Sequence, residues 1–209
     1  MLEDFRAALE PGAGVIDIGA NVGEYARVYA AKVGPTGYVL AVEADPSTVK
    51  VCRHACAEFP TIHVRHAAVL DREGAATIHR DGKDHRRNSL WAANVIEPNG
   101  ESLEVPTVTL DSLAVEVPNL RAIKIDAQGA EAAIVRGAPE TLQRRDVTWQ
   151  VELWHQGLLA AGASIEELAE TFARNGWYPA GWTWPRVCEA VKSVGQHGSV
   201  DVVLRWQAA

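Results

Sequence analysis

The side chains best suited to proton transfer follow two predicted strands in the second half of the chain. Asp126 ends a predicted strand at residues 120–128, and Glu152 and His155 lie at the end of another at residues 147–154. Open α/β sheets bind ligands at the carboxyl ends of their strands, where a carboxylate or an imidazole can accept the proton of a hydroxyl. These three residues are the candidate catalytic groups. His155 is favoured as the base because an unperturbed imidazole titrates near about pH 6.5, with a structural hydrogen bond in a loop as its alternative role.

A divalent cation is a less favoured interpretation of the same residues. Carboxylates and imidazole suit Mg²⁺ or Mn²⁺, so Asp126, Glu152 and His155 could in principle form such a site. The histidines of the chain have no metal-ligand spacing such as H-E-x-x-H, and its three cysteines are too scattered for a four-ligand zinc site. The sequence therefore predicts no metal.

A glycine-containing turn follows the first predicted strand, in the segment VIDIGANVGEYA at residues 15–26. A dinucleotide-binding turn would have a second glycine where this chain has Asn21, because the backbone must approach a pyrophosphate closely there. Asp17 precedes the turn, and its carboxylate disfavours phosphate but suits an ammonium group. A zwitterionic amino acid satisfies both features, with its ammonium near Asp17 and its carboxylate at the backbone N–H groups of the turn. S-adenosylmethionine is such a ligand and contains no phosphate.

An acidic residue at the end of the second predicted strand supports this interpretation. Glu43 follows Gly19 by 24 residues, and the offset at which a carboxylate binds ribose hydroxyls in nucleotide-binding folds is about 20. Both hydroxyls of an adenosyl ribose could bind one carboxylate. Asp45 has a second possible role, since an aspartate directly before Pro46 is typical of a helix cap.

The apolar pattern indicates an α/β sheet. Strands are predicted at 14–19, 38–44 and 61–69, with helices at 22–33 and 46–58 between them. Later strands at 120–128 and 147–154 alternate with a helix at 129–142, which breaks near Gly137, and a helix that begins at Ser164. Within the strand at 120–128, Lys124 is predicted to form a structural salt bridge, with a role in the site as the alternative.

Two further segments are predicted to be antiparallel. Residues 74–110 alternate apolar and polar side chains beside a charged loop at 79–88, which is either solvated or part of a flap on the substrate side. The segments WYPAGWTW (177–184) and SVDVVLRW (199–206) are predicted to form two strands joined by a loop, as a hairpin at the edge of the sheet.

Length and charge restrict the class of protein. The 209 residues suit one domain, 1–209. No apolar run approaches the roughly 18 residues that span a bilayer, and three cysteines suit a reducing compartment, so we expect a cytoplasmic protein without a secretory signal. The net charge of −7 repels polyanions, which makes nucleic acid a disfavoured partner.

Several segments together resemble the FkbM-type S-adenosylmethionine-dependent methyltransferases. They are VIDIGANVGEYA, AVEADPSTV, HAAVLDREGAATI, TLDSL and IKIDAQGAEAAIVRGAPETL, which follow in this order from about Gly14 to Leu142. The resemblance implies a three-layer, Rossmann-like class I methyltransferase fold with a seven-stranded, mostly parallel sheet and a C-terminal antiparallel hairpin. It also implies methyl transfer to a hydroxyl oxygen of a small metabolite, such as a sugar, a polyketide or another natural-product intermediate.

The resemblance further implies which residues bind the cofactor. Gly19, Asn21 and Gly23 would shape the methionine pocket, Glu43 would bind the ribose, and the backbone at 67–68 would lie near the adenine. The full predicted cofactor set is Asp17, Gly19, Ala20, Asn21, Gly23, Tyr25, Glu43, Ala44, Asp45, Ala67, Ala68 and Asp126. The chain departs from the family at Gln128, where an acidic residue is usual, so a role that needs a charge there, including part of a metal site, is not supported.

The acceptor is predicted to be a small molecule held by aromatic and hydroxyl side chains. Tryptophan offers a flat apolar face with one donor, which suits the wall of a sugar-like or flat ligand. Trp182 and Trp184 fall in the segment GWTWP of the predicted hairpin loop, and Ser89 and Trp91 follow the charged loop. These four are the candidate acceptor-binding residues, with core packing as the alternative for the tryptophans.

Three other functions share some of these features. An RNA or protein methyltransferase would have the same fold, but the acidic charge opposes RNA. A nicotinamide-dependent oxidoreductase is opposed by Asn21 and Asp17. A ligand-binding protein that keeps the fold without catalysis is consistent with the sequence, which does not indicate the oligomeric state.

Overall fold

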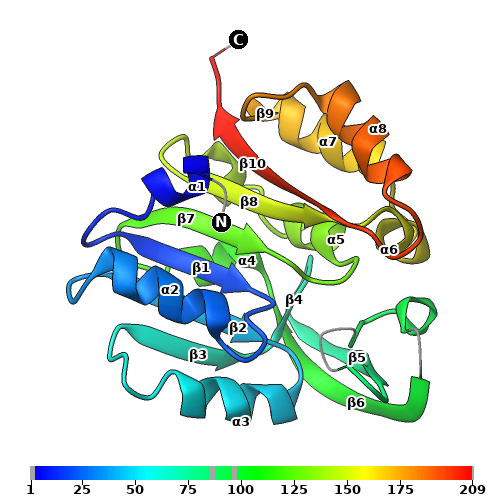
Figure 1. The fold of residues 1–209 in the computed structure, drawn as a ribbon, viewed down its shortest axis with the longest axis horizontal. Coiled ribbons are helices and arrows are strands. Elements are labelled where there is room, and N and C mark those ends of the chain that lie inside the picture. Colours follow the sequence, from blue (N-terminus) through cyan, green and yellow to red (C-terminus); the bar gives the residue numbers. More distant parts are fainter. Residues whose placement is uncertain (1–2, 85–87, 96–97, 209) are drawn as a thin grey trace.

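The computed structural model describes residues 3–84, 88–95 and 98–208. Its main element is a seven-stranded sheet with the order β3-β2-β1-β7-β8-β10-β9 (Figure 1). In that order the strands are Ile62–His66, Tyr38–Glu43, Gly14–Ile18, Leu120–Ile125, Thr148–Leu153, Val200–Trp206 and Trp177–Pro179. The first five strands pair in parallel, and β10 is antiparallel to both β8 and β9. The predicted seven-stranded, mostly parallel sheet with a C-terminal antiparallel pair is confirmed.

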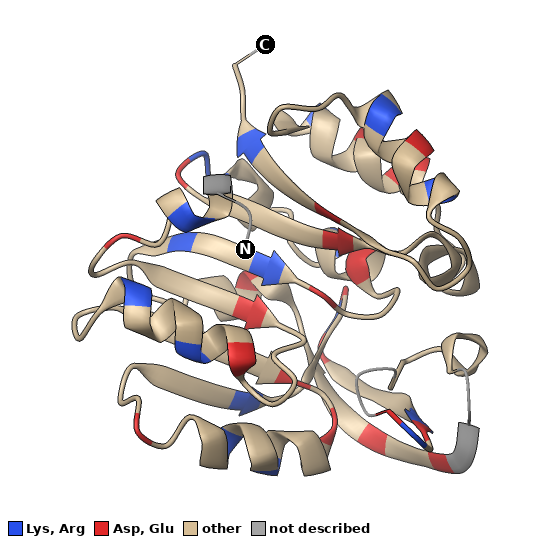
Figure 2. Ribbon diagram, in the orientation of Figure 1, with Lys and Arg blue, Asp and Glu red and all other residues tan. Residues whose placement is uncertain are grey.

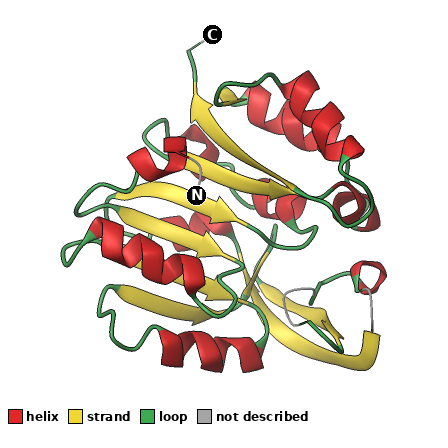
Figure 3. Cartoon of the chain, viewed as in Figure 1, coloured by secondary structure: helices red, strands yellow, loops and turns green. Residues whose placement is uncertain are grey.

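Helices cover both faces of the sheet and make a three-layer fold (Figure 3). One face packs against α1 (Glu3–Ala7), α2 (Glu24–Val33) and α3 (Pro46–Ala55). The other packs against α4 (Leu110–Ala114), α5 (Glu131–Arg136), the 3₁₀ helix η3 (Thr141–Gln143), α6 (His155–Ala160), α7 (Ile165–Arg174) and α8 (Trp184–Ser193). The alternation of side chains along β1 explains the division, because Ile16 and Ile18 join one apolar cluster and Val15 joins the other. In the described part of the chain, no helix has the length and apolar character that a bilayer crossing requires.

Residues 74–108 form a separate element, which we call the flap. Its strands β5 (Gly74–Asp81) and β6 (Pro98–Val108) are antiparallel, and β4 (Ala68–Val69) completes a three-stranded sheet by pairing in parallel with β6. The 3₁₀ helix η2 (Ala92–Asn94) lies between β5 and β6. The prediction of antiparallel strands here is confirmed, whereas residues 85–87 of the predicted charged loop lie outside the described residues. Figure 1 shows the flap beside the carboxyl ends of the central strands.

Two predictions about element boundaries are wrong. The strand expected at 61–69 is broken at Ala67, because β3 pairs with β2 whereas β4 pairs with β6. The loop expected between the last two strands contains α8. That helix has Pro185 in its first turn and buries Trp184, Val187 and Val191, a spacing that forms one apolar stripe on a helix.

Side-chain caps start two of the helices as the sequence predicts. Asp45 caps α3, and its Oδ1 accepts hydrogen bonds from the backbone N–H groups of Ser47 and Thr48 at 2.8 and 2.9 Å. Ser164 and Glu167 form a capping box at the start of α7. The cap at Asp45 matters most for the site, because it fixes the chain directly after Glu43.

Candidate active site

A cavity of about 550 Å³ lies between the carboxyl ends of β1, β2, β7 and β8 and the flap. This volume falls within the range of about 300–1,000 Å³ that is usual for small-molecule sites. The predicted site residues that line it are Gly19, Ala20, Asn21, Tyr25, Glu43, Ala44, Ala67, Ala68, Ser89, Asp126 and Glu152. Seven predicted residues of the described chain do not line it: Asp17, Gly23, Asp45, Trp91, His155, Trp182 and Trp184. The structure thus brings most of the predicted cofactor residues together with two of the three catalytic candidates.

The turn after β1 packs too tightly for side chains at two of its glycines. Gly19 has φ 76°, and a Cβ atom there would lie 1.8 Å from the carbonyl oxygen of Asp126. Gly23 has φ 82°, and its Cβ would lie 2.5 Å from Sγ of Cys56. Asn21 also has a left-handed backbone, with φ 51°, which asparagine tolerates better than most residues. Gly19 therefore allows the turn to contact the end of β7, whereas the left-handed backbone at Asn21 still accommodates a side chain.

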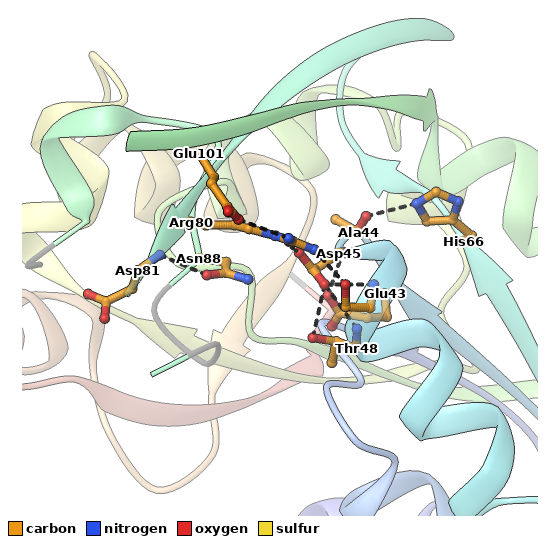
Figure 4. Close-up of polar contacts among 10 residues, drawn as sticks. Glu43, Ala44, Asp45, Thr48, His66, Arg80, Asp81, Asn88 and Glu101 are labelled. Atoms are coloured by element: carbon orange, nitrogen blue, oxygen red, sulfur yellow. Dashed lines mark hydrogen bonds and ion pairs between the residues drawn. The ribbon is translucent and has the colours of Figure 1, made fainter. Parts of the chain in front are cut away.

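Glu43 ends β2, and backbone groups hold its carboxylate at the cavity. Its Oε2 accepts a hydrogen bond from the N–H of Asn21, and its Oε1 accepts one from the N–H of Asp45, both at 2.9 Å. Burial raises the pKa of Glu43, and these two hydrogen bonds partly offset that effect. Figure 4 shows Glu43 beside Ala44 and Asp45. Each carboxylate oxygen keeps acceptor capacity for a further donor, as a ribose diol requires.

Asp17 is buried on the α2 side of the sheet instead of facing the cavity. Its Oδ1 lies 3.9 Å from Nζ of Lys124, and no described residue donates a hydrogen bond to either of its carboxylate oxygens. Burial raises the pKa of Asp17 to about 6, although the charge of Lys124 opposes this effect. The predicted direct contact of Asp17 with a ligand's ammonium group does not fit this position.

Asp126, Gln128 and Glu152 form a hydrogen-bonded cluster at the ends of β7 and β8. Nε2 of Gln128 donates to Oδ1 of Asp126 at 3.2 Å and to Oε2 of Glu152 at 3.3 Å. Lys124 forms a buried salt bridge with Asp126, from Nζ to Oδ2 at 2.9 Å, which is the structural role that the sequence favours. The hydroxyl of Ser199 donates to Oε1 of Glu152 at 2.8 Å. Both carboxyl groups are therefore held in fixed positions at the cavity.

The two carboxyl groups differ in acidity. Burial raises the pKa of Glu152 to about 8, and the charge of Asp126 and a hydrogen bond with it raise that pKa further. Burial would also raise the pKa of Asp126, but the charge of Lys124 and the hydrogen bond with Glu152 outweigh it and lower that pKa. At neutral pH the pair therefore holds one proton, which resides on Glu152.

Two side chains of the flap contact the segment that follows β7. Oγ of Ser89 and Nδ2 of Asn94 both donate to the backbone oxygen of Gln128, at 3.1 Å each. Ser89 is buried and lines the cavity, as the prediction of an acceptor-side position requires. Sequence reasoning missed Asn94, because its importance depends on where the flap packs. Gly129 allows this contact, since a Cβ there would lie 2.7 Å from Nδ2 of Asn94 and 2.6 Å from the oxygen of Gly157.

His155 and Trp91 lie outside the cavity. His155 is the first residue of α6, not a loop residue as predicted, and its Nδ1 is buried without a hydrogen-bond partner among the described residues. Trp91 precedes η2 and packs against the main apolar cluster, and its backbone N–H donates to Oγ of Ser89 at 3.3 Å. His155 thus does not line the cavity beside Asp126 and Glu152.

Trp182 and Trp184 lie around the start of α8 and do not line the cavity. Trp184 is buried, stacks on Phe172 with ring centroids 5.9 Å apart, and donates from Nε1 to the oxygen of Trp177. Trp182 is exposed and contacts the guanidinium of Arg186. Core packing therefore accounts for Trp184, and neither tryptophan is near the cavity.

The described residues contain no group of three or more histidine, cysteine, aspartate or glutamate side chains that could hold a metal ion. Asp126 and Glu152 come together, but the third proposed ligand, His155, does not join them. The amide of Gln128 lies between the two carboxyl groups instead.

The charged residues that line the cavity are acidic. Within the described chain they are Glu24, Glu43, Asp126 and Glu152. Figure 2 shows acidic positions at the start of α2 and the end of β8. This lining disfavours a diphosphate and fits S-adenosylmethionine, whose sulfonium gives it a net positive charge. The fixed carboxylate of Glu43 and the cavity volume also suit its adenosyl group.

The strand order and the position of the cavity are those of the class I methyltransferase fold. The crystal structure of the FkbM methyltransferase from Methylobacillus flagellatus KT superposes with a TM-score of 0.58 at 13% identity, covering 94% of this chain and 44% of that chain. The fibrillarin of Methanococcus jannaschii, a pre-rRNA processing protein, matches with a TM-score of 0.54 at 12% identity, over 97% of this chain and 70% of its own. Aeropyrum pernix fibrillarin, in complex with S-adenosyl-L-methionine, matches with a TM-score of 0.52 at 10% identity, over 94% of this chain and 68% of its own. These matches show a shared fold, and this chain spans less than half of the Methylobacillus protein.

The family follows from the sequence match. The FkbM methyltransferase domain matches residues 17–176, and the chain therefore belongs to the FkbM methyltransferase family. A search of curated proteins gives no match. The resemblance in the sequence motifs is thus confirmed, and it covers the turn, the flap and the cluster at the ends of β7 and β8.

Proposed function

We propose that this protein transfers the methyl group of S-adenosylmethionine to a hydroxyl group of a small metabolite bound in the cavity. The turn at Gly19 and Asn21 would bind the methionine part, Glu43 the ribose, and the backbone of residues 67–68 the adenine. When bound, S-adenosylmethionine supplies an electrophilic methyl group on a positively charged sulfur. The remaining tasks of the protein are to align the acceptor and to remove its proton.

The carboxyl pair in the cavity is the single observation that carries this proposal. Glu152 is the base in our proposal, because the ionised form of a carboxyl with a pKa of about 8 is a stronger base than an ordinary glutamate. The acceptor oxygen gains the methyl group and its proton passes to the ionised carboxylate of Glu152. Asp126, held by Lys124 and Gln128, keeps the pKa of Glu152 high through its negative charge. This proposal replaces His155 as the favoured base.

Binding of the cofactor product is the first test. S-adenosylhomocysteine at about 100 times its dissociation constant is expected to stabilise the protein by roughly 2.7 kcal/mol, whereas NAD and NADP give no thermal shift. Glu43→Gln should abolish the shift, since the amide NH₂ would face a backbone N–H and one carboxylate acceptor would be lost. Glu24→Gln is the matched control, because Glu24 also lines the cavity but has no part in the ribose site. A shift with NAD alone would contradict the proposal.

The pH dependence of activity tests the base. Glu152 accepts a proton only when ionised, so kcat/KM should rise with pH and level off above about pH 8. Glu152→Gln should lower kcat by about 10²- to 10⁴-fold. Asp126→Asn removes the charge that raises the pKa of Glu152, so the rise should move to lower pH. His155→Gln should retain turnover and the wild-type profile, and a loss of the pH dependence in this variant alone would restore His155 as the base.

A small acceptor fits the charge better than RNA does. The net charge of −7 and the acidic cavity lining oppose a polyanion, although the fibrillarin neighbours include a pre-rRNA processing protein. Release of S-adenosylhomocysteine should be measured with a panel of hydroxylated sugars and polyketides and with structured RNA. Turnover with RNA alone would identify the alternative acceptor class.

A further inference from the structure

One arginine of the flap joins the acceptor side of the cavity to the cofactor side. Arg80, near the end of β5, donates from Nε to Oδ2 of Asp45 at 2.6 Å and from an Nη atom to Oγ of Ser47 at 2.7 Å. A second Nη atom donates to Oε2 of Glu101 on β6 at 3.2 Å. Figure 4 shows the guanidinium of Arg80 between Glu101 and Asp45. The side chain therefore links both strands of the flap to the start of α3.

Asp45 is a fixed partner for this arginine. Its side chain is 3% exposed, and its Oδ1 already accepts the hydrogen bonds that cap α3. Its backbone N–H donates to Oε1 of Glu43, whose Oε2 accepts from Asn21. The contacts thus run without interruption from β5 through Asp45 and Glu43 to the turn after β1. The ion pair is buried at Asp45, whereas Arg80 is 20% exposed, and removing either partner loses a charge-assisted hydrogen bond.

The same strand contributes to the cavity wall. Ile78, two residues before Arg80, lines the cavity, and Ser89, whose backbone pairs with His79, also lines it. The position of these acceptor-side residues relative to Glu43 therefore depends on how the end of β5, at Arg80, is held. Besides Arg80, the flap is held by the two-residue strand β4, by the contacts of Ser89 and Asn94 with Gln128, and by apolar packing of Leu90 and Trp91 on the main cluster.

We infer that Arg80 is a positioning residue that couples occupancy of the ribose site at Glu43 to the order of the flap. This inference rests on the proposed function, because it takes the adenosyl ribose as the ligand of Glu43. A ligand on Glu43 stabilises the carboxylate that holds Asp45, and Asp45 in turn holds Arg80. Cofactor binding would then order the flap residues before the acceptor arrives.

Hydrogen exchange with and without S-adenosylhomocysteine tests the coupling. In the wild type, saturating S-adenosylhomocysteine should slow exchange of the amides at residues 76–80 and 89–94 by about fivefold or more, the smaller end of typical coupling between sites. In Arg80→Gln, S-adenosylhomocysteine should still bind, with protection of the turn after β1, but protection of the flap amides should be lost. Arg80→Lys, which retains the charge but not the fork of donors, should give intermediate protection. Arg72→Gln is the matched control, because Arg72 is highly exposed and its ion pair among the described residues is with the neighbouring Asp71.

The outcomes separate this inference from the proposed function. If the wild type binds no S-adenosylhomocysteine, the proposed function fails. If it binds but Arg80→Gln keeps the full protection of the flap, the coupling is refuted while the proposed function stands. Loss of binding in Arg80→Gln and Arg80→Lys together would also refute it, because Arg80 would then be part of the cofactor pocket itself. Should Arg80→Gln fail to fold, Arg80→Lys decides the question. Reduced protection of the flap amides in Arg80→Lys supports the coupling, and full protection refutes it.

Discussion

Glu131 is the buried acid whose ionisation should most clearly affect stability. It begins α5 and is 1% exposed. Its Oε1 accepts hydrogen bonds from the backbone N–H groups of Ala127 and Gly129 at 3.1 and 3.2 Å, whereas its Oε2 has no partner among the described residues. Burial raises the pKa of Glu131 to about 7, and the hydrogen bonds oppose this only in part. We predict that Glu131→Gln stabilises the protein at alkaline pH relative to the wild type.

The sign and size follow from proton linkage. Between pH 4.5 and about 7 the unfolded chain is ionised at this residue while the folded protein holds the proton, so wild-type stability falls as pH rises through this window. A pKa of about 7 in the folded state against 4.5 in the unfolded state corresponds to a loss of about 3 kcal/mol above pH 7. Glutamine does not ionise and keeps an oxygen for the two N–H donors. The variant should therefore gain about 2 to 3 kcal/mol on the wild type between pH 5 and pH 8.

Urea denaturation at pH 5, 6, 7 and 8 measures this difference. The slope of the unfolding free energy against urea should be the same for variant and wild type, and the difference between their midpoints should increase as the pH rises. In thermal melts the gain corresponds to on the order of 5 to 10 °C for a domain of this size. Asp17 and Glu152 also have raised pKa values, of about 6 and about 8, but their contribution cancels in the comparison of variant with wild type. Glu140→Gln, at an exposed position, is the control, and a stability difference for Glu131→Gln that does not change with pH would refute the reasoning.

Two further predictions concern packing. Gly129→Ala should lower the free energy of unfolding by about 3 kcal/mol or more, because φ is 101° and the added Cβ would lie 2.6 Å from the oxygen of Gly157. Gly162→Ala is the control, because φ is 72° there but no atom lies within 4 Å of the added Cβ. It should lower the free energy of unfolding by only about 1 to 2 kcal/mol in the same denaturation assay. Trp184→Ala should lower the free energy of unfolding by about 3 to 5 kcal/mol, and Trp182→Ala by less than about 1 kcal/mol. The affinity of both variants for S-adenosylhomocysteine, measured by calorimetry, should equal that of the wild type. Weaker binding by either variant would show that its tryptophan belongs to the site.

Local sequence patterns were sufficient for the parts of the fold that depend on neighbouring residues. The strands up to β8 and the caps at Asp45 and Ser164 follow from alternation, helical period and capping chemistry. The break at Ala67 does not, because it depends on β4 pairing with β6, about forty residues away. The helix α8 could have been predicted, because its apolar spacing is visible in the sequence, but Gly181 and Pro185 favoured a loop. The position of β10 between β8 and β9 depends on tertiary packing and is not determined by any local sequence pattern.

In the site, too, the residues fixed by local sequence were predictable and those fixed by long-range packing were not. The turn and Glu43 were predictable because a short segment and one strand end determine them. The position of Asp17 was also in the sequence, because alternation with Ile16 and Ile18 directs it to the other face of β1. Gln128 and Asn94 were not predictable as site residues, since their contacts require β8 and the flap to meet the end of β7. The position of His155 at the start of α6, outside the cavity lining, was likewise not predicted.

The charge balance beneath the cavity explains why a buried group of acids suits this cofactor. Lys124 is the cation of the described cluster, and three carboxyl groups surround it, on Asp17, Asp126 and Glu152. Raised pKa values of about 6 for Asp17 and about 8 for Glu152 leave the first mostly ionised and the second protonated at neutral pH, while the lowered pKa of Asp126 keeps it ionised. One positive and two negative charges give the cluster a net charge of about −1. A negative cluster attracts a sulfonium, and it attracts the uncharged thioether product less, so the same charges favour cofactor binding before transfer and product release after it.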